Sequence, residues 1–400
     1  MKNLYEERML AIRRYVEGEA PCQIYTRFGR SSRWFFTWKL RYDMYGLDGL
    51  KDLSRAPKHQ AEHTDDALET AIVNIRILRE QRDRDDTKYA FIGAVAIHKE
   101  LHALGYVPPC VKTVHNILVR NGLVTPKPGP QTVREVIDRH YPAFDISLPG
   151  QLQQLDLIGP RYLQGSAQKY YLYTLRDVCS RRIAIETGKN HPARTICKAL
   201  ISSWQRMGMP TLLQHDNALE FRGSNRYPHS AGLLTKLCVA LNVESVFVPA
   251  REPWRNGTLE NFNGLFQRLV LKTQHIQDFS QLQHEVKAFE LVANTQHPHV
   301  PLHGKTSQEY EQSLNFHPTL LSPDLTLGTP FHGTPTRNAN VSFIWRIRKS
   351  GNITIASEKF AIDPDLAWDY VYATIFVKEQ MLKIYHQGEA IKAFPYKREL

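Results

Sequence analysis

Two parts of the chain alternate apolar and polar residues, which is the pattern of half-buried β-strands. In the middle of the chain these runs end at turn signals, and segments with apolar residues three and four apart follow them and predict helices. The predicted strands are a run from Gln151 to a stop at Gly159-Pro160, then Tyr170–Leu175, Arg182–Thr187, Leu212–Asp216 and Ser245–Pro249. The predicted helices are Pro192–Met207, Ala231–Leu241 and one that begins near Glu260. Strands that alternate with helices indicate an α/β core, which we place at residues 141–312.

The second alternating part lies near the C-terminus. Its short runs are Val341–Arg348, Asn352–Ala356, Tyr370–Val377 and Leu382–Tyr385. Their lengths and spacing predict a small, separate β-barrel at residues 339–400. Residues 313–338 contain four prolines and are expected to link this barrel to the core.

The N-terminal third has helical periodicity and reads as two all-α helix-turn-helix units, at residues 1–58 and 62–125. In the first unit, Gly29 breaks the chain and Ser31 caps a recognition helix over Ser32–Tyr45, with Trp34, Phe35, Trp38 and Leu40 mostly in the core. In the second unit the corresponding helix is Val111–Asn121, although a plain three-helix packing module fits nearly as well. The proline-rich residues 126–140 then form a semi-rigid linker.

The chain has an excess of basic residues, because it contains 51 Lys and Arg and 40 Asp and Glu, which give a net charge of +11. Such an excess favours a polyanionic partner. The candidate DNA contacts are Arg30, Arg33, Lys39 and Arg41 in the first unit and Lys112, Thr113 and Asn116 in the second. The charged N-terminal residues are unlike a secretory signal, and no apolar run is long enough to span a bilayer, so we expect a cytoplasmic protein without a membrane partner.

Cysteine and histidine patterns give little support for a zinc site. The five cysteines are scattered without a Cys-x-x-Cys pair, which argues against a zinc knuckle and against a disulfide framework. His297, His299 and His303 lie close together among prolines. A loop that binds zinc is one reading of these histidines, and solvated or DNA-facing side chains are the more ordinary one.

Carboxylates in the core are the strongest chemical signal. Asp156 is placed on a strand, Asp216 at a strand's end and Glu260 in the first turn of a helix. Each alone reads more readily as a solvated turn residue. Together they could hold two cations about 3.5–4 Å apart, which activate one oxygen and stabilise another in phosphodiester attack. Mg²⁺ accepts such oxygen ligands without histidine or cysteine.

The order of Asp156, the His215–Phe221 segment and the Asn256–Asn263 segment resembles the integrase core of bacterial insertion-sequence transposases, which share a ribonuclease H-like fold with retroviral integrases. The resemblance implies that Asp156, Asp216 and Glu260 are catalytic and bind two Mg²⁺ or Mn²⁺ ions. It also implies double-stranded DNA as partner (element ends and target), a homo-oligomer on DNA, and a DNA contact at Arg268. The predicted C-terminal barrel is similar to one found in many members.

Two residues compete with this assignment. Glu252 lies at the family's common spacing after the second aspartate, whereas Glu260 lies eight residues later. We favour Glu260, because an amphipathic helix can hold its carboxylate in one orientation. Asp177 also ends a strand, and we expect a structural role for it.

These observations predict a DNA transposase that nicks element ends and transfers the freed strands to target DNA. A ribonuclease H-type nuclease is the first alternative, although it would not need two DNA readers. A domesticated DNA-binding protein with an inactive core is the second, and the retention of all three acids counts against it.

Overall fold

The computed structural model describes residues 4–53, 64–125, 141–163, 165, 167–218, 221, 231–249, 252–327 and 340–397. The chain divides into two compact units, Met1–His63 and Thr64–Leu400. The domain boundaries expected within the second unit remain predictions.

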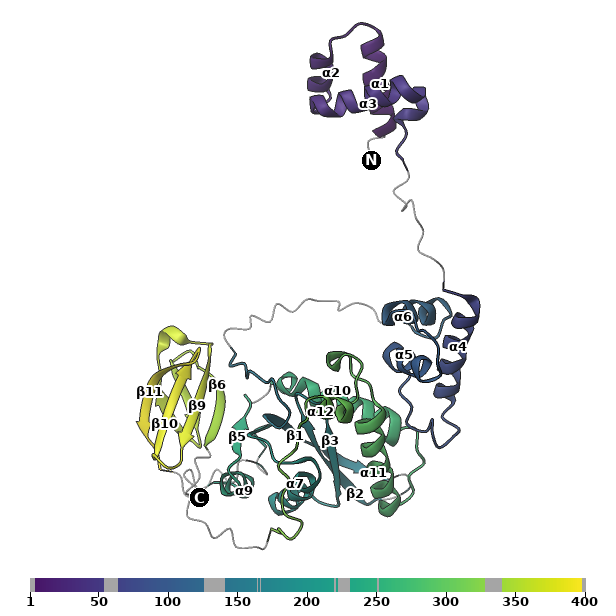
Figure 1. The fold of residues 1–400 in the computed structure, drawn as a ribbon. Coiled ribbons are helices and arrows are strands. Elements are labelled where there is room, and N and C mark those ends of the chain that lie inside the picture. The colour runs from purple at the N-terminus through teal and green to yellow at the C-terminus, as the bar shows by residue number, and fades with distance from the viewer. Residues whose placement is uncertain are drawn as a thin grey trace. The chain divides into compact units, whose positions relative to one another are not determined.

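The first unit is a small helical domain (purple in Figure 1). Its helices are α1 Leu4–Val16, α2 Pro21–Arg27, α3 Ser32–Tyr45 and the 3-10 turn η1 Gly46–Leu50. Ile12, Ile24 and Phe35 form its buried centre. The Ser31 hydroxyl accepts a hydrogen bond from the backbone N–H of Trp34 at 3.2 Å, which confirms the predicted start of α3.

The second unit begins with another three-helix arrangement. Its helices are α4 Asp66–Gln81, α5 Ala94–Ala103 and α6 Val111–Arg120. They meet in an aliphatic cluster that includes Ile72, Ile97 and Ile117. The buried Arg76 on α4 donates hydrogen bonds to the carbonyl oxygens of Ile92, just before α5, at 2.5 Å and of Leu123, just after α6, at 3.0 Å, and so ties the three helices together.

These three helices are attached to the core by contacts that sequence patterns did not predict. The Tyr89 hydroxyl donates to the Glu285 carboxylate, and Lys88 pairs with the same carboxylate at 2.7 Å. Phe91 stacks on His297 with ring centroids 3.8 Å apart. Residues 64–125 therefore pack against the core in this structure.

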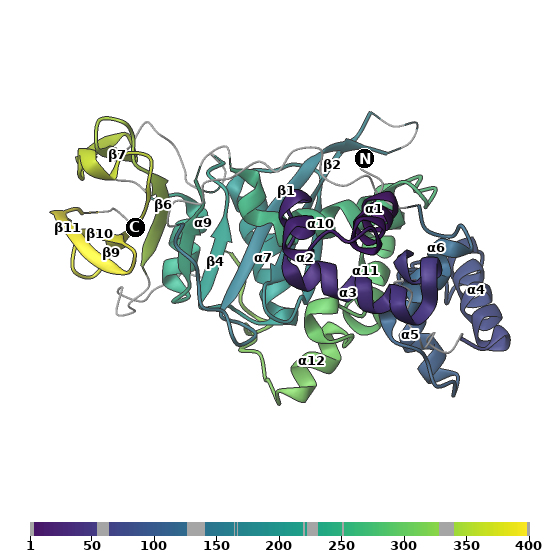
Figure 2. The same ribbon diagram turned by 90° about the horizontal axis from the view of Figure 1, so that it is seen from above.

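The core sheet has nine strands in the order β11-β10-β9-β6-β5-β4-β1-β2-β3. The strands of the predicted α/β core are β1 Leu152–Tyr162, β2 Lys169–Asp177, β3 Ile183–Gly188, β4 Leu212–His215 and β5 Glu244–Phe247. β1 to β3 are antiparallel neighbours, whereas β4 pairs parallel with β1 and β5 pairs parallel with β4. Strands β4, β1 and β2 run side by side in Figure 2. This arrangement fits the expected integrase-like core.

Helices cover both faces of this sheet. The helices are α7 Ala193–Met207, α9 Leu233–Ala240, α10 Gly257–Phe266, α11 Phe279–Gln296 and α12 Ser307–Ser313, with short helical turns η2 Pro253–Asn256, η3 Gln267–Leu271 and η4 Val300–Leu302. α7 and α9 pack on the face that carries Tyr171, Tyr173 and Leu213. α10 and α11 pack on the other face, against Tyr170 and Leu172. Among the described residues, no helix has the length and apolar character needed to cross a membrane.

Strand β1 corrects one expectation, because it does not stop at Gly159-Pro160. It continues to Tyr162 through an irregularity in its pairing with β2 between Ile158 and Arg161. A side chain at Gly159 would have its Cβ 2.6 Å from the Tyr171 ring, so the bend needs glycine. The turn signal here marks a bulge, and Asp156 lies mid-strand.

The C-terminal strands correct a second expectation, because they do not form a clearly separate barrel. They are β6 Val341–Arg346, β9 Tyr370–Phe376, β10 Met381–His386 and β11 Glu389–Pro395, with a separate hairpin of β7 Asn352–Ile355 and β8 Glu358–Ala361 and the 3-10 turn η5 Pro364–Leu366. β6 pairs parallel with β5, and Phe343 stacks on Phe247 with centroids 4.7 Å apart. The alternation correctly marked strands, but it could not tell that β6 would cover the edge that β5 otherwise exposes.

Candidate active site

The first predicted acid, Asp156, points from β1 toward the face that carries α10. Its Oδ1 accepts a hydrogen bond from the Leu157 N–H at 2.9 Å, and its Oδ2 accepts one from the Asn263 amide at 2.7 Å. Asn263 lies on α10, three residues after Glu260. The contact therefore ties the strand of the first acid to the helix of the third.

Asp216 directly follows β4, as the sequence predicts, and its neighbours fix its backbone. The His215 ring is buried, with Nδ1 2.9 Å from the Asp216 carbonyl and Nε2 2.7 Å from the Ser245 hydroxyl. A carbonyl only accepts, so Nδ1 carries the proton and Nε2 accepts from Ser245. Burial lowers the pKa of His215 to about 4, so the ring stays neutral near pH 7.

Glu260 lies in the first turn of α10, also as predicted, and its side chain is exposed. The helix start is held by polar side chains of the sheet. The Gln214 amide donates to the Asn256 side-chain oxygen at 2.7 Å, and Arg176 donates to the Thr258 carbonyl at 2.5 Å. Sequence reasoning did not find these residues, and their only signal is that buried strands carry polar side chains at positions 176 and 214.

The charges of Asp216 and Glu260 act on the carboxyl group of Asp156. Burial raises the pKa of Asp156 to about 6, and the charges of Asp216 and Glu260 add to this rise against the hydrogen bonds from Leu157 and Asn263. The side-chain oxygen of Asn263 is buried and accepts no hydrogen bond from the described residues. Asp156 thus lies within reach of two further carboxylate charges, in a cluster rich in oxygen donors.

This surplus of oxygen donors fits a hard divalent cation in its chemistry. The described residues contain no group of three or more His, Cys, Asp and Glu side chains so placed that they could already hold a metal ion. Mg²⁺ usually keeps waters and takes substrate phosphates as well, so it does not need a closed protein cage. The fit is therefore one of donor type and charge.

The raised pKa of Asp156 predicts that this residue lowers the stability of the metal-free protein when it is ionised. We expect Asp156→Asn to stabilise the metal-free protein by about 2 kcal/mol at pH 8, because it removes an ionised group whose folded-state pKa lies above its unfolded value. The destabilisation by Asp156 is complete above pH 6, shrinks as the pH falls, and is absent below the unfolded value of 3.8. A flipped Asn263 amide could accept from the new side chain.

Thermal unfolding in EDTA at a series of pH values measures this effect. A gain in stability that does not depend on pH, or a loss at pH 8, would contradict the assignment.

The competing acids have other partners. Glu252 accepts hydrogen bonds from Tyr370 at 2.6 Å and from Arg255 at 3.1 Å, and it is not among the charges that act on Asp156. Asp177 is buried and accepts from the Gly150 N–H at 2.8 Å and from the Ser180 N–H and hydroxyl. Asp177 therefore has the structural role that was expected.

The histidines do not form the zinc loop considered as an alternative. His297 is half-buried, His299 is buried and His303 is exposed, and no metal-binding group was found among the described residues. Burial lowers the pKa of His297 to about 3, with a further contribution from the charge of Arg176. The rings of His297 and Phe91 instead join the core to the segment before α5.

The candidate DNA contacts of the first unit differ in how they are engaged. Arg30 pairs with Glu7 at 2.8 Å, Lys39 pairs with Asp43 at 2.6 Å, and Arg41 donates to the Lys51 carbonyl at 2.8 Å. Arg33 is exposed, and within residues 4–53 its side chain makes no hydrogen bond or ion pair. Most of the four apolar residues of α3 expected in the core lie in or against it, since Phe35 is fully buried and Trp34 and Trp38 pack against the cluster, whereas Leu40 is 60% exposed.

On α6, Lys112 and Asn116 are exposed, as DNA contacts require, and His115 lies on the same face. Thr113 is partly buried, and its hydroxyl lies 3.2 Å from the Cys110 sulfur. In the core, Arg268 is exposed at the π-helical turn that follows α10. None of these positions opposes the predicted role, and none demonstrates it.

A matched pair on α3 tests DNA contact. We expect Arg33→Ala to weaken binding of duplex DNA about tenfold and to lower the slope of log affinity against log salt by about 0.9 if Arg33 contacts a phosphate. Lys39→Ala is the control, because Asp43 already compensates its charge. Titrations at several salt concentrations measure both, and equal effects of the two variants would contradict the assignment.

Comparisons with known proteins found a family model for the N-terminal residues and solved structures similar to larger parts of the chain. Residues 8–69 match the winged helix-turn-helix family, a class of DNA-binding domain. The magnesium-bound catalytic core of HTLV-2 integrase, in its trimeric form, shares 18% identity over 41% of this chain and 97% of its own, with a TM-score of 0.32. The BIV integrase catalytic core shares 16% identity over 42% of this chain and 97% of its own, with a TM-score of 0.32.

One chain of a larger assembly is also similar to this chain. In the simian T-cell lymphotropic virus intasome bound to the PP2A regulatory subunit B56 gamma, the matching chain shares 14% identity over 77% of this chain and 99% of its own, with a TM-score of 0.37. At such scores the fold assignment rests on the strand order and pairing described above.

Proposed function

We propose that this chain is a DNA transposase that binds the ends of a mobile element, nicks them and joins the freed strands to target DNA in the cytoplasm. The observation that carries the proposal is that Asp156, whose pKa is raised first by burial, also feels the charges of Asp216 and Glu260, so that carboxylates from three separate elements gather at one place. Such a cluster is costly in a protein without a cation and useful with one.

In this proposal the residues of the chain have separate tasks. Asp156, Asp216 and Glu260 hold two Mg²⁺ or Mn²⁺ ions, which supply activation of the attacking oxygen and stabilisation of the leaving one. Asn263 holds Asp156 in place, and neutral His215 holds the backbone of Asp216. The first unit and α6 deliver the DNA through Arg33, Lys112 and Asn116, and several copies of the chain assemble on it.

The exposed Arg268 completes the proposed DNA path. It follows Glu260 by two turns of helix and lies outside the buried cluster of α10 and α11. We assign it a phosphate contact near the reacting strand.

The decisive experiment uses a duplex that carries the terminal inverted repeats found in DNA flanking the gene. With Mn²⁺ or Mg²⁺, we expect nicks at the repeat ends and joined products, and none in excess EDTA. Cleavage that persists in EDTA would reject the two-metal site. Cleavage of an RNA–DNA hybrid but not of the ends would favour a ribonuclease H-type enzyme, and end binding without cleavage would favour an inactive core.

A further inference from the structure

The segment just before α10 is held by aromatic side chains from two distant parts of the chain. The Arg255 guanidinium lies over the Tyr141 ring, 3.5 Å from its centroid, and 5.2 Å from that of Tyr370. The two tyrosine rings meet edge to face at 5.2 Å. Glu252 completes the group by accepting from both Arg255 and Tyr370. We call Tyr141, Glu252, Arg255 and Tyr370 the aromatic clamp.

The clamp is largely shielded from water. The side chains of Arg255 and Glu252 are each 11% exposed. At this degree of burial an ion pair keeps its geometry only if its remaining hydrogen-bonding groups are satisfied. The Tyr370 hydroxyl meets this need for Glu252, with a donor–acceptor distance of 2.6 Å. Loss of that hydroxyl would leave one carboxylate oxygen without its donor.

The backbone of the clamp is joined to both strands that carry the aspartates. The Arg255 carbonyl accepts from the Gln214 amide at 3.2 Å and from the Gln154 amide at 3.5 Å. Gln154 stands two residues before Asp156 on β1 and therefore on the same face of the sheet, and Gln214 stands on β4 two residues before Asp216. The residue after Arg255 is the N-cap of α10, which carries Glu260.

We infer that the aromatic clamp positions Glu260 relative to Asp156 and Asp216, so that β9 of the C-terminal strands is part of the catalytic platform. This inference rests on the proposed function. The exposed Glu260 side chain has little packing of its own, so its placement depends on where α10 begins. The clamp fixes that start from the side of the sheet remote from α7.

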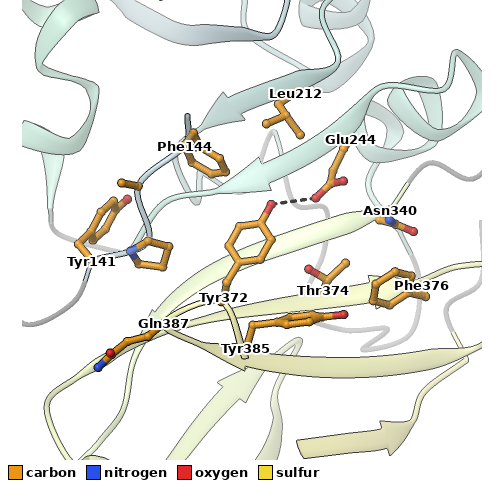
Figure 3. Close-up of a pocket in the computed structure, with 13 residues that line it drawn as sticks. Tyr141, Phe144, Leu212, Glu244, Asn340, Tyr372, Thr374, Phe376, Tyr385 and Gln387 are labelled. Atoms are coloured by element: carbon orange, nitrogen blue, oxygen red, sulfur yellow. Dashed lines mark hydrogen bonds between the residues drawn. The ribbon is translucent and has the colours of Figure 1, made fainter. Parts of the chain in front are cut away.

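A neighbouring tyrosine provides the matched control. Tyr372 lies two residues after Tyr370 on β9 and donates to Glu244 at 2.8 Å, beside a cavity of about 750 Å³ (Figure 3). Phe144 packs edge to face against Tyr372 in that cavity. Tyr372→Phe therefore removes a partly buried hydroxyl from the same strand without touching Glu252 or Arg255.

The experiment measures Mn²⁺ binding by the full-length chain without DNA, as the Mn²⁺ concentration that gives half of the maximal rise in melting temperature. We expect Tyr370→Phe to raise this Mn²⁺ concentration about fivefold and Arg255→Ala to raise it more than tenfold. For comparison, loss of a residue that bonds directly to a metal ligand typically weakens metal affinity roughly 10–100-fold. Tyr372→Phe should leave it unchanged. The same order is expected for the Mn²⁺ concentration that gives half-maximal nicking.

Equal values for Tyr370→Phe and wild type, or equal increases for Tyr370→Phe and Tyr372→Phe, would overturn the inference. If Tyr370→Phe melts far below wild type in EDTA, the same Mn²⁺ concentration is measured for Arg255→Lys and compared with wild type. This variant keeps the charge next to Glu252 but loses the flat stacking surface. An unchanged value for Glu260→Gln would show instead that the proposed metal site itself is wrong.

Discussion

Replacing Glu260 with Gln is expected to lower the rates of end nicking and strand joining on the order of 10³-fold, while end binding stays intact. The physical reason is that an amide cannot carry the charge that holds a divalent cation, and a metal ion contributes several kcal/mol to the stabilisation of developing charge, with each 1.36 kcal/mol worth tenfold in rate. Nicking assays on purified protein at saturating Mn²⁺ measure the effect, and gel shifts confirm binding.

Glu252→Gln is the comparison that makes this result specific. Glu252 lies at the more usual spacing for the family, but its carboxylate bonds to Arg255 and Tyr370. We expect Glu252→Gln to keep most of its activity at saturating Mn²⁺ and to lose activity only when Mn²⁺ is limiting. The opposite ranking of the two variants would show that the third acid has been assigned to the wrong residue.

Removal of residues 1–63 is the second change with a large expected effect. These residues form a compact unit of their own and contain most of the segment that matches winged helix-turn-helix domains. Specific protein–DNA complexes are typically at least 10³-fold tighter than nonspecific ones, so we expect the remaining chain to lose preference for element ends by roughly that factor. Its Mn²⁺ binding should not change.

Competition between labelled ends and random duplex at fixed salt measures this preference. A chain of residues 64–400 that still selects its ends as well as wild type would place sequence reading on α6 or in the core. Arg33→Ala in the intact chain should move in the same direction by a smaller amount.

Sequence patterns predicted the local features well and the long-range ones poorly. The period of alternation located β1 to β5, and Ser31 marked the start of α3, because these signals depend on neighbouring residues. The positions of Asp216 at a strand end and Glu260 in a first helical turn agree for the same reason. Their approach to Asp156 was expected only from the resemblance to a family.

Local sequence signals could not determine which strands pair with one another or which distant side chains form hydrogen bonds. An alternating run such as Val341–Arg346 is equally suited to close a barrel or to extend a sheet, and only the free edge of β5 decides between them. Likewise, nothing around Tyr370 in the sequence indicates that its hydroxyl meets Glu252, 118 residues earlier. The polar residues Gln154, Gln214 and Asn256 read as ordinary strand and turn residues until their shared hydrogen bonds are known.

The bond between Tyr370 and Glu252 can form only late in protein synthesis, because Tyr370 follows Glu252 by 118 residues. A ribosome adds about 5–20 residues per second from the N-terminus, so the helix-turn-helix unit and both aspartate strands emerge before β9 exists. A chain broken off before β9, by a premature stop codon or a protease, keeps the residues proposed to bind element ends but lacks the tyrosine that bonds to Glu252. We expect such a fragment to occupy ends without joining them, and so to act as an inhibitor of the full-length protein in the same cell.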